Sequence, residues 1–183
     1  MRIPRQTLYL CMVCIAGMLG CRNTTPQKKF FDIPAYFRKE IKTLQTNAIT
    51  ISKSSTYNGH RSQQDLRASN INWEKELAVF LEADINKPAY LANMRVDSTA
   101  YPGKGYQLMY TATSPKLSIR HVVINMKEEE ELVNIDIEKS NLISTTHINA
   151  YYLKGKRYAI SGEQAVQNLG DQNQFFIEGN FLK

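Results

Sequence analysis

Residues 117–137 read LSIRHVVINMKEEEELVNIDI, and this stretch predicts the architecture of the folded part of the chain. Apolar residues alternate along both of its halves, first Val122, Ile124 and Met126, and then Val133, Ile135 and Ile137. Such alternation is typical of strands with one buried face. The phase changes just before Val122, which predicts a β-bulge near Arg120–His121.

The same alternation continues in the neighbouring sequence. It appears at Tyr106–Tyr110, Ile148–Tyr152, Tyr158–Ile160 and Phe175–Phe181. Because the connections are short, we expect consecutive antiparallel strands, a meander. In a meander the acidic turn at 128–131 and the basic turn at 154–157 lie at the same end of the sheet, about 10 Å apart.

Helices are predicted upstream of these strands. Apolar residues recur at helical spacing over 33–47, with Asp32 as the N-cap, and a second helix begins near Asn70–Asn72 and ends before Pro88. We interpret 93–105 as loop with at most one short strand. Residues 48–67 allow either a longer first helix or a polar hairpin around Asn58–Gly59.

The predicted fold class is therefore α+β. Two N-terminal helices pack on a curved antiparallel meander sheet of five to seven strands, in one domain over 32–183. In architecture alone, such a sheet half-wrapped around helices resembles the carriers that ferry lipoproteins or lipids through a periplasm.

Residues 1–20 have the pattern of an export signal. Arg2 and Arg5 precede an uncharged apolar run, Leu8–Leu19, which is too short to span a membrane. The run ends in Met18-Leu19-Gly20-Cys21. This end resembles the lipobox of bacterial lipoproteins, although Leu19 replaces the small residue usual there. The resemblance implies cleavage between Gly20 and Cys21 and acylation of Cys21, for example with palmitate.

The resemblance also implies a location. Two or more acyl chains hold a protein stably at a bilayer, so residues 21–31 become a lipidated cysteine and a basic tether. Arg22 stands where an aspartate commonly retains lipoproteins in the inner membrane. We therefore expect the periplasmic face of the outer membrane, and the body is similar to uncharacterised envelope lipoproteins of Gram-negative bacteria.

Charge is concentrated beside the predicted anchor. Residues 22–42 carry six basic and two acidic side chains, whereas 43–183 carry fifteen of each. A basic stem suits an anionic membrane surface or simply remains solvated. We expect no nucleic-acid partner, since no basic face with base-stacking elements is apparent.

The candidates for chemistry are weak. The histidines are His60, His121 and His147, and the last two could form a metal site with Asp136 or Glu138 only if strands brought them together. Their spacing matches no metal motif, and the G-x-S-x-G nucleophile elbow is absent. Ser161-Gly162-Glu163 is interpreted as a strand-end turn. We expect no enzyme activity, no cofactor and no metal.

The prediction for function is a lipid-anchored envelope protein that binds or scaffolds a partner without catalysis. The alternative is a carrier or chaperone that holds an apolar ligand between sheet and helices. Its cavity would be lined by Phe175, Ile177, Val133, Ile135 and Trp73. The expected partner is an envelope protein or an apolar ligand. The sequence does not identify it further, and it gives no oligomeric state.

Overall fold

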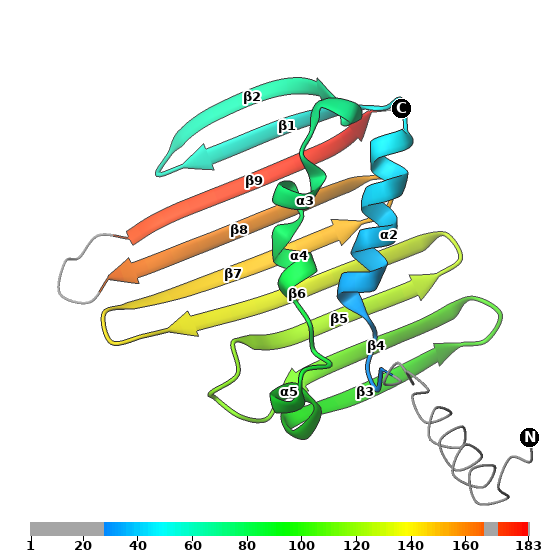
Figure 1. Ribbon diagram of the computed structural model, residues 1–183, viewed down its shortest axis with the longest axis vertical. Helices are drawn as coiled ribbons and strands as arrows, with labels where there is room; N and C mark the ends of the chain where they lie inside the picture. Colours follow the sequence, from blue (N-terminus) through cyan, green and yellow to red (C-terminus); the bar gives the residue numbers. More distant parts are fainter. Residues whose placement is uncertain (1–27, 167–171, 183) are drawn as a thin grey trace, which may run out of the picture.

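A computed structural model describes residues 28–166 and 172–182 of the chain (Figure 1). The predicted signal segment with Gly20 and Cys21 lies outside these residues. Nine antiparallel strands form one sheet within the described residues. They are β1 (Thr50–Tyr57), β2 (His60–Arg67), β3 (Met94–Tyr101), β4 (Gly105–Ala112), β5 (Ile119–Lys127), β6 (Glu130–Ser140), β7 (Ser144–Leu153), β8 (Arg157–Val166) and β9 (Gln172–Leu182). Their order is β2-β1-β9-β8-β7-β6-β5-β4-β3.

The meander is confirmed for β3 to β9, where every strand pairs with the next one in the sequence. The predicted bulge is also confirmed, since the β5–β6 register shifts between Ile119 and His121. The two predicted turns share one end of the sheet, where Lys154 Nζ lies 2.9 Å from Glu131 Oε1. The acidic turn is shorter than expected, because β6 already begins at Glu130.

The predicted fold class is wrong. The described chain is mostly β, with 55% strand and 21% helix, and only one of its helices reaches seven residues. That helix is α2 (Ile33–Thr46), capped by Asp32 as predicted. In place of a second long helix there are three short ones, α3 (Trp73–Glu76), α4 (Ala78–Glu82) and α5 (Pro88–Asn93), after a 3-10 turn over Ala68–Asn70.

The two strands beyond the predicted maximum come from polar sequence. Residues 48–67 resolve as the hairpin β1–β2, in which Asn58 and Gly59 both adopt positive φ, as a tight hairpin turn requires. Residues 93–105, predicted as loop with at most one short strand, contain the whole of the eight-residue β3. Both β2 and β3 are edge strands that are exposed along nearly their full length. A strand without a buried face shows no apolar alternation, so the sequence indicated β2 only as part of one of two alternatives and β3 only as at most a short strand.

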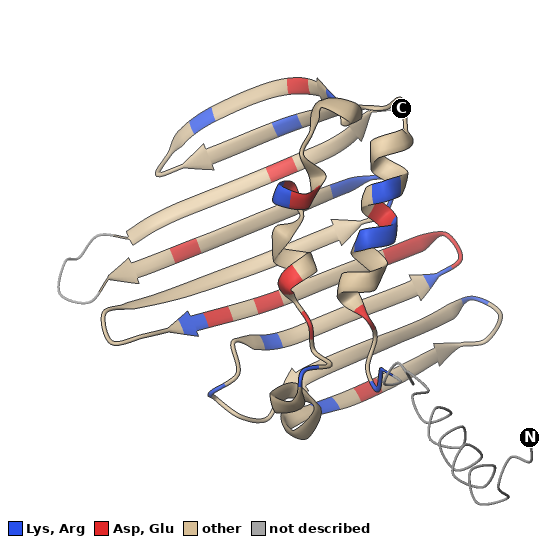
Figure 2. Cartoon of the chain, viewed as in Figure 1, with Lys and Arg blue, Asp and Glu red and all other residues tan. Residues whose placement is uncertain are grey.

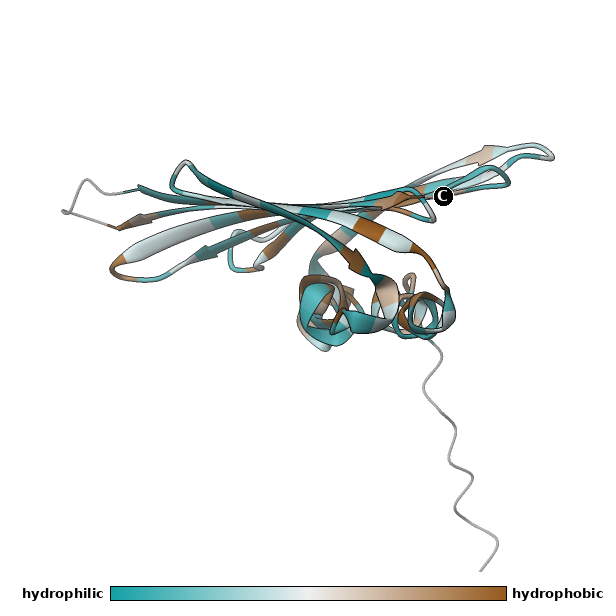
Figure 3. Ribbon diagram, turned by 90° about the horizontal axis from the view of Figure 1, so that it is seen from above, coloured by the Kyte–Doolittle hydropathy of each residue, from teal (hydrophilic) through white to brown (hydrophobic). Residues whose placement is uncertain are grey.

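All the helices of the described chain cover one face of the sheet (Figures 1 and 3). The core lies between the two layers. Phe37 of α2 stacks on Phe80 of α4 with ring centroids 4.2 Å apart, and it meets the ring of Tyr152 of β7 edge-on at 5.1 Å. Trp73 is fully buried and donates from Nε1 to the Ala68 carbonyl at 2.9 Å.

Three tyrosine–glutamate hydrogen bonds tie the helices to the sheet. Tyr152 donates to Glu40 of α2 at 2.9 Å, and Tyr158 donates to Glu76 of α3 at 2.7 Å. In the third, Tyr36 of α2 donates to Glu131 of β6 at 3.0 Å. Gly179 leaves the space for Tyr158, since a Cβ there would lie 2.2 Å from that ring. These bonds satisfy polar groups at a buried interface, where an unpaired group is costly.

Candidate functional site

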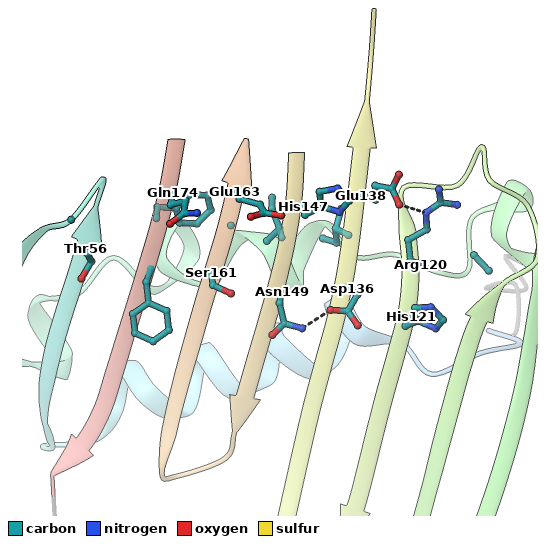
Figure 4. Close-up of a pocket in the computed structure, with 17 residues that line it drawn as sticks. Thr56, Arg120, His121, Asp136, Glu138, His147, Asn149, Ser161, Glu163 and Gln174 are labelled. Carbon is teal, nitrogen blue, oxygen red and sulfur yellow. Dashed lines mark hydrogen bonds and ion pairs between the residues drawn. The ribbon is translucent and has the colours of Figure 1, made fainter. Parts of the chain in front are cut away.

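No helix of the described residues lies on the opposite face of the sheet, which we call the open face (Figure 3). Cross-strand register places His121, Asp136, Asn149 and Ser161 side by side on β5 to β8. We call these four residues the polar row. Figure 4 shows their side chains lying together on the open face, with Thr56 of β1 further along the same line. Adjacent strands are about 4.8 Å apart, so the row crosses some 14 Å of sheet.

A second line of polar side chains lies next to the polar row, nearer the ends of the strands (Figure 4). It consists of Arg120, Glu138, His147, Glu163 and Gln174. Arg120 Nε lies 3.1 Å from Glu138 Oε2. This hydrogen bond from the guanidinium, with its positive charge, holds the pKa of Glu138 below its ordinary value.

Both lines border one hollow of about 900 Å³ on the open face. The ring of Phe176, 40% exposed, lines it beside Ser161 of the neighbouring strand. The hollow therefore combines hydrogen-bonding side chains with an accessible aromatic ring. Pockets that bind small molecules have this mixed character.

Amide groups connect the polar row to the rest of the open face. The side-chain nitrogen of Asn149 donates to Asn134 Oδ1 at 3.0 Å and also to Asp136. Nearer the β3 edge, Gln107 donates to Asn125 at 2.8 Å. These bonds pre-orient side chains that retain further donors and acceptors.

The charged residues of the open face are only partly paired, and Asp136 and Glu163 at the hollow form no salt bridge with a described residue. Arg157 lies 3.6 Å from Glu178 and stacks over the ring of Tyr151, 5.0 Å from its centroid. Arg120 is paired with Glu138. Three carboxylates and one guanidinium therefore border the hollow, among neutral hydrogen-bonding groups.

The arrangement does not form a hydrolytic triad. Ser161 faces Asn149 and Phe176 across the strands. Among the described residues, no hydrogen bond joins its hydroxyl to His121, three strands and about 14 Å away, or to His147, which lies diagonal to it on β7. A serine nucleophile needs its base within hydrogen-bonding reach, about 3 Å. Ser161-Gly162-Glu163, predicted as a turn, lies inside β8 and has no exposed elbow geometry.

Paired carboxylates offer no better case for catalysis. Glu138 and Glu163 flank His147 on successive strands. A glycosidase-type general acid needs a raised pKa, whereas the pKa of Glu138 is lowered by Arg120. The imidazole of His147 also stands between the two carboxylates, where substrate or water would have to lie (Figure 4).

The histidines are placed as follows. The sheet brings His121 opposite Asp136 and His147 opposite Glu138, so the four residues named for one possible metal site share a face of β5 to β7. Within residues 28–166 and 172–182, no three His, Cys, Asp or Glu side chains are grouped to hold a metal ion. His60 lies on the exposed edge strand β2, away from both pairs.

The residues predicted to line an apolar cavity do not enclose one. Trp73, Val133 and Ile135 are fully buried in the packed core, and Phe175 and Ile177 pack at its margin. Sequence reasoning did not identify the polar row, although a usable signal was present. Once the meander is assumed, polar residues in matching phase on four successive strands predict a shared face.

Comparisons with protein-family models, with curated proteins and with solved structures found no match to this chain. Among the helices that the structure describes, none is long and apolar enough to cross a membrane. The functional argument therefore rests on the open face and on the residues that form it.

Proposed function

We propose that this protein is a lipid-anchored, non-enzymatic binding module of the cell envelope, and that its open sheet face binds a neutral, hydroxyl-rich ligand such as a glycan. The observation that carries the proposal is the polar row with its adjoining hollow. Acylated Cys21 would hold the module at the periplasmic face of the outer membrane, which follows from the lipobox resemblance.

The side-chain chemistry of the open face favours this class of ligand. Sugar hydroxyls both donate and accept hydrogen bonds, as do the amide of Asn149 and the hydroxyl of Ser161. The exposed ring of Phe176 offers an apolar surface for the C–H face of a sugar ring. Asp136 and Glu163 border the hollow without a salt bridge to a described residue, so a strongly anionic ligand would be repelled.

The shape of the face supports an extended ligand. The polar row runs across strands without an intervening wall, and the sheet continues past it to Thr56 of β1 (Figure 4). A chain of sugars could lie along the row and contact one strand after another. An apolar carrier function has less support. The residues expected to line its cavity are packed in the core, and the hollow of about 620 Å³ that does lie between the helices and the sheet is bordered by charged residues such as Arg38, Glu82 and Lys139.

Ligand binding is tested by calorimetric titration of the full-length protein with two neutral oligosaccharides, one with acetamido groups and one with hydroxyls only. We expect binding of at least one, and Asn149→Ala should weaken it about 3- to 10-fold through loss of a hydrogen bond. Asn47→Ala, an exposed asparagine at the end of α2, is the matched control and should change nothing. Equal affinities of wild type, Asn149→Ala and Asn47→Ala would remove the polar row from the proposal.

The anchor is tested separately by mass spectrometry of the N-terminus and by fractionation of cells expressing Cys21→Ala. We expect an acylated residue 21 in the native protein and release of the variant from the membrane fraction. An intact first twenty residues or an unmodified thiol at position 21 would contradict the anchor.

A further inference from the structure

The outward face of α2 is basic. Arg38, Lys39 and Lys42 are exposed along it at helical spacing, whereas the helix's only carboxylate, Glu40, is buried against the sheet and accepts from Tyr152. Figure 2 shows the basic segments of α2 on the side that carries the helices. One amphipathic helix thus places its negative charge in the core and its positive charges on the surface.

Other carboxylates of the helix layer are also engaged in contacts. Glu76 accepts from Tyr158 and lies 2.6 Å from Lys53 of the sheet. Asp84 accepts from the Asn86 backbone N–H at 2.9 Å and lies 3.8 Å from Lys28. Asp32 caps α2.

These contacts leave the outer surface of the layer with an excess of positive charge. Its exposed bases, Lys29, Arg38, Lys39, Lys42, Lys75 and Lys87, outnumber its exposed acids, Glu74 and Glu82. The sequence alone does not show this, because the layer's acidic and basic residues are nearly equal in number.

The N-terminal segment joins the fold at this same layer. Phe30 is buried, and its backbone N–H donates to Asn86 Oδ1 at 2.9 Å. The next N–H, that of Phe31, donates to the hydroxyl of Tyr110 of β4 at 3.1 Å. These bonds fix the point from which the tether leaves. The six residues between Cys21 and Lys28 span at most about 21 Å when extended.

We infer that the helix layer faces the bilayer and binds its anionic headgroups through Arg38, Lys39 and Lys42, so that the open sheet face points away from the membrane. This inference rests on the lipid anchor of the proposed function. A short tether would keep this basic surface close to the anionic lipid. Each basic residue near the headgroups then adds to the electrostatic attraction. The hollow of the open face is bordered by three carboxylates, Asp136, Glu138 and Glu163, and by one guanidinium, so this face gains nothing by approaching anionic lipid.

The test uses the full chain reconstituted into vesicles with a lipid-attached quencher of tryptophan fluorescence. The native Trp73 is the only tryptophan and is fully buried, so it gives a constant background. One reporter variant is Gln45→Trp on the outward face of α2, and the other is Met109→Trp on the open face, where the side chain is 41% exposed. Vesicles contain either phosphatidylglycerol with phosphatidylcholine or phosphatidylcholine alone.

We expect strong quenching of the Gln45→Trp reporter in anionic vesicles and little quenching of Met109→Trp. We then introduce Lys39→Glu and Lys42→Glu together into the Gln45→Trp reporter. The population whose helix layer faces the bilayer should fall about fivefold or more per substituted residue, and the quenching should be lost. Adding Lys104→Glu with Lys156→Glu makes the same change in net charge in two turns of the sheet and should leave it unchanged. High salt should mimic the α2 variant, since it screens exposed charges.

The outcomes separate this inference from the proposed function. Flotation of the vesicles in a density gradient shows whether the protein is attached to them. If the protein floats with neither kind of vesicle, the anchor itself is contradicted. A protein that floats with both, but whose two reporters are quenched equally or whose α2 variant behaves like the turn variant, keeps the anchor and overturns the orientation.

Discussion

The two faces of the sheet are built from the same strands but follow different physical rules, and Tyr151 and Tyr152 show this most directly. Tyr152 is fully buried among rings of the helix layer and donates to a buried carboxylate. Tyr151 lies on the open face beneath the guanidinium of Arg157. The covered face therefore stabilises the fold, whereas the residues of the open face are less constrained by folding stability and can be suited to a ligand.

The largest expected difference between the faces is in stability. Tyr152→Ala should lower the free energy of unfolding by about 3–5 kcal/mol, because it leaves a cavity and removes the donor to Glu40. Tyr151→Ala should cost about 1 kcal/mol, since its ring is only partly buried. Urea denaturation of both variants measures the contrast. Similar losses for the two would mean that the open face contributes to the core, and the comparison would fail.

The sequence predicted the part of the fold in which the two faces differ most. Strands β5 to β8 alternate apolar and polar residues because one side of each strand is buried and the other is exposed to solvent. The bulge before His121 was visible in the sequence as a change in the phase of this alternation. Strands β2 and β3 lack a buried face and gave no such pattern. The second helix was predicted as continuous, but the chain bends at Leu77, whose φ of −104° and ψ of 20° separate α3 from α4. Propensity and periodicity are not sensitive to a single such residue.

The candidate binding surface was harder to predict from the sequence than the core. The polar row depends on which residues stand opposite one another across strands, and a slip of one residue would send His121 and Asp136 to the other face. The sequence suggested that His121 and His147 could meet Asp136 or Glu138, but it did not give the register that places Asn149 and Ser161 in line with His121 and Asp136. The pairing of buried tyrosines with glutamates likewise depends on tertiary contacts, which no local pattern encodes.

An intermediate effect is expected at alkaline pH. Burial raises the pKa of Tyr36, Tyr110, Tyr152 and Tyr158 above the ordinary value, and glutamate neighbours contribute for Tyr36, Tyr152 and Tyr158. All four lie at the interface between helices and sheet. Their folded-state pKa exceeds the unfolded one, so the stability they contribute is complete below about pH 10 and is lost as the pH rises further.

Unfolding free energy should therefore fall above pH 10 by about 1.4 kcal/mol per pH unit for each such tyrosine. Denaturation series between pH 9 and 11.5 measure this slope. In Tyr158→Phe this slope should be smaller by the contribution of one titrating proton. In Tyr57→Phe, at a position that is 57% exposed, the slope should be unchanged. A slope that is the same in both variants would contradict the assignment to the covered face.

The smallest effect is expected from the ion pair on the open face. Arg120→Ala removes the guanidinium that holds the pKa of Glu138 low, so NMR titration should show this pKa rising toward its ordinary value. A lowered folded-state pKa contributes stability above the unfolded pKa and loses it as the pH falls through the folded one. Because water screens this pair, the urea midpoint at neutral pH should scarcely move, in contrast to Tyr152→Ala. A large loss of stability in Arg120→Ala would mean that the open face is held as tightly as the covered one, and it would then be a poor candidate for a surface shaped by its ligand.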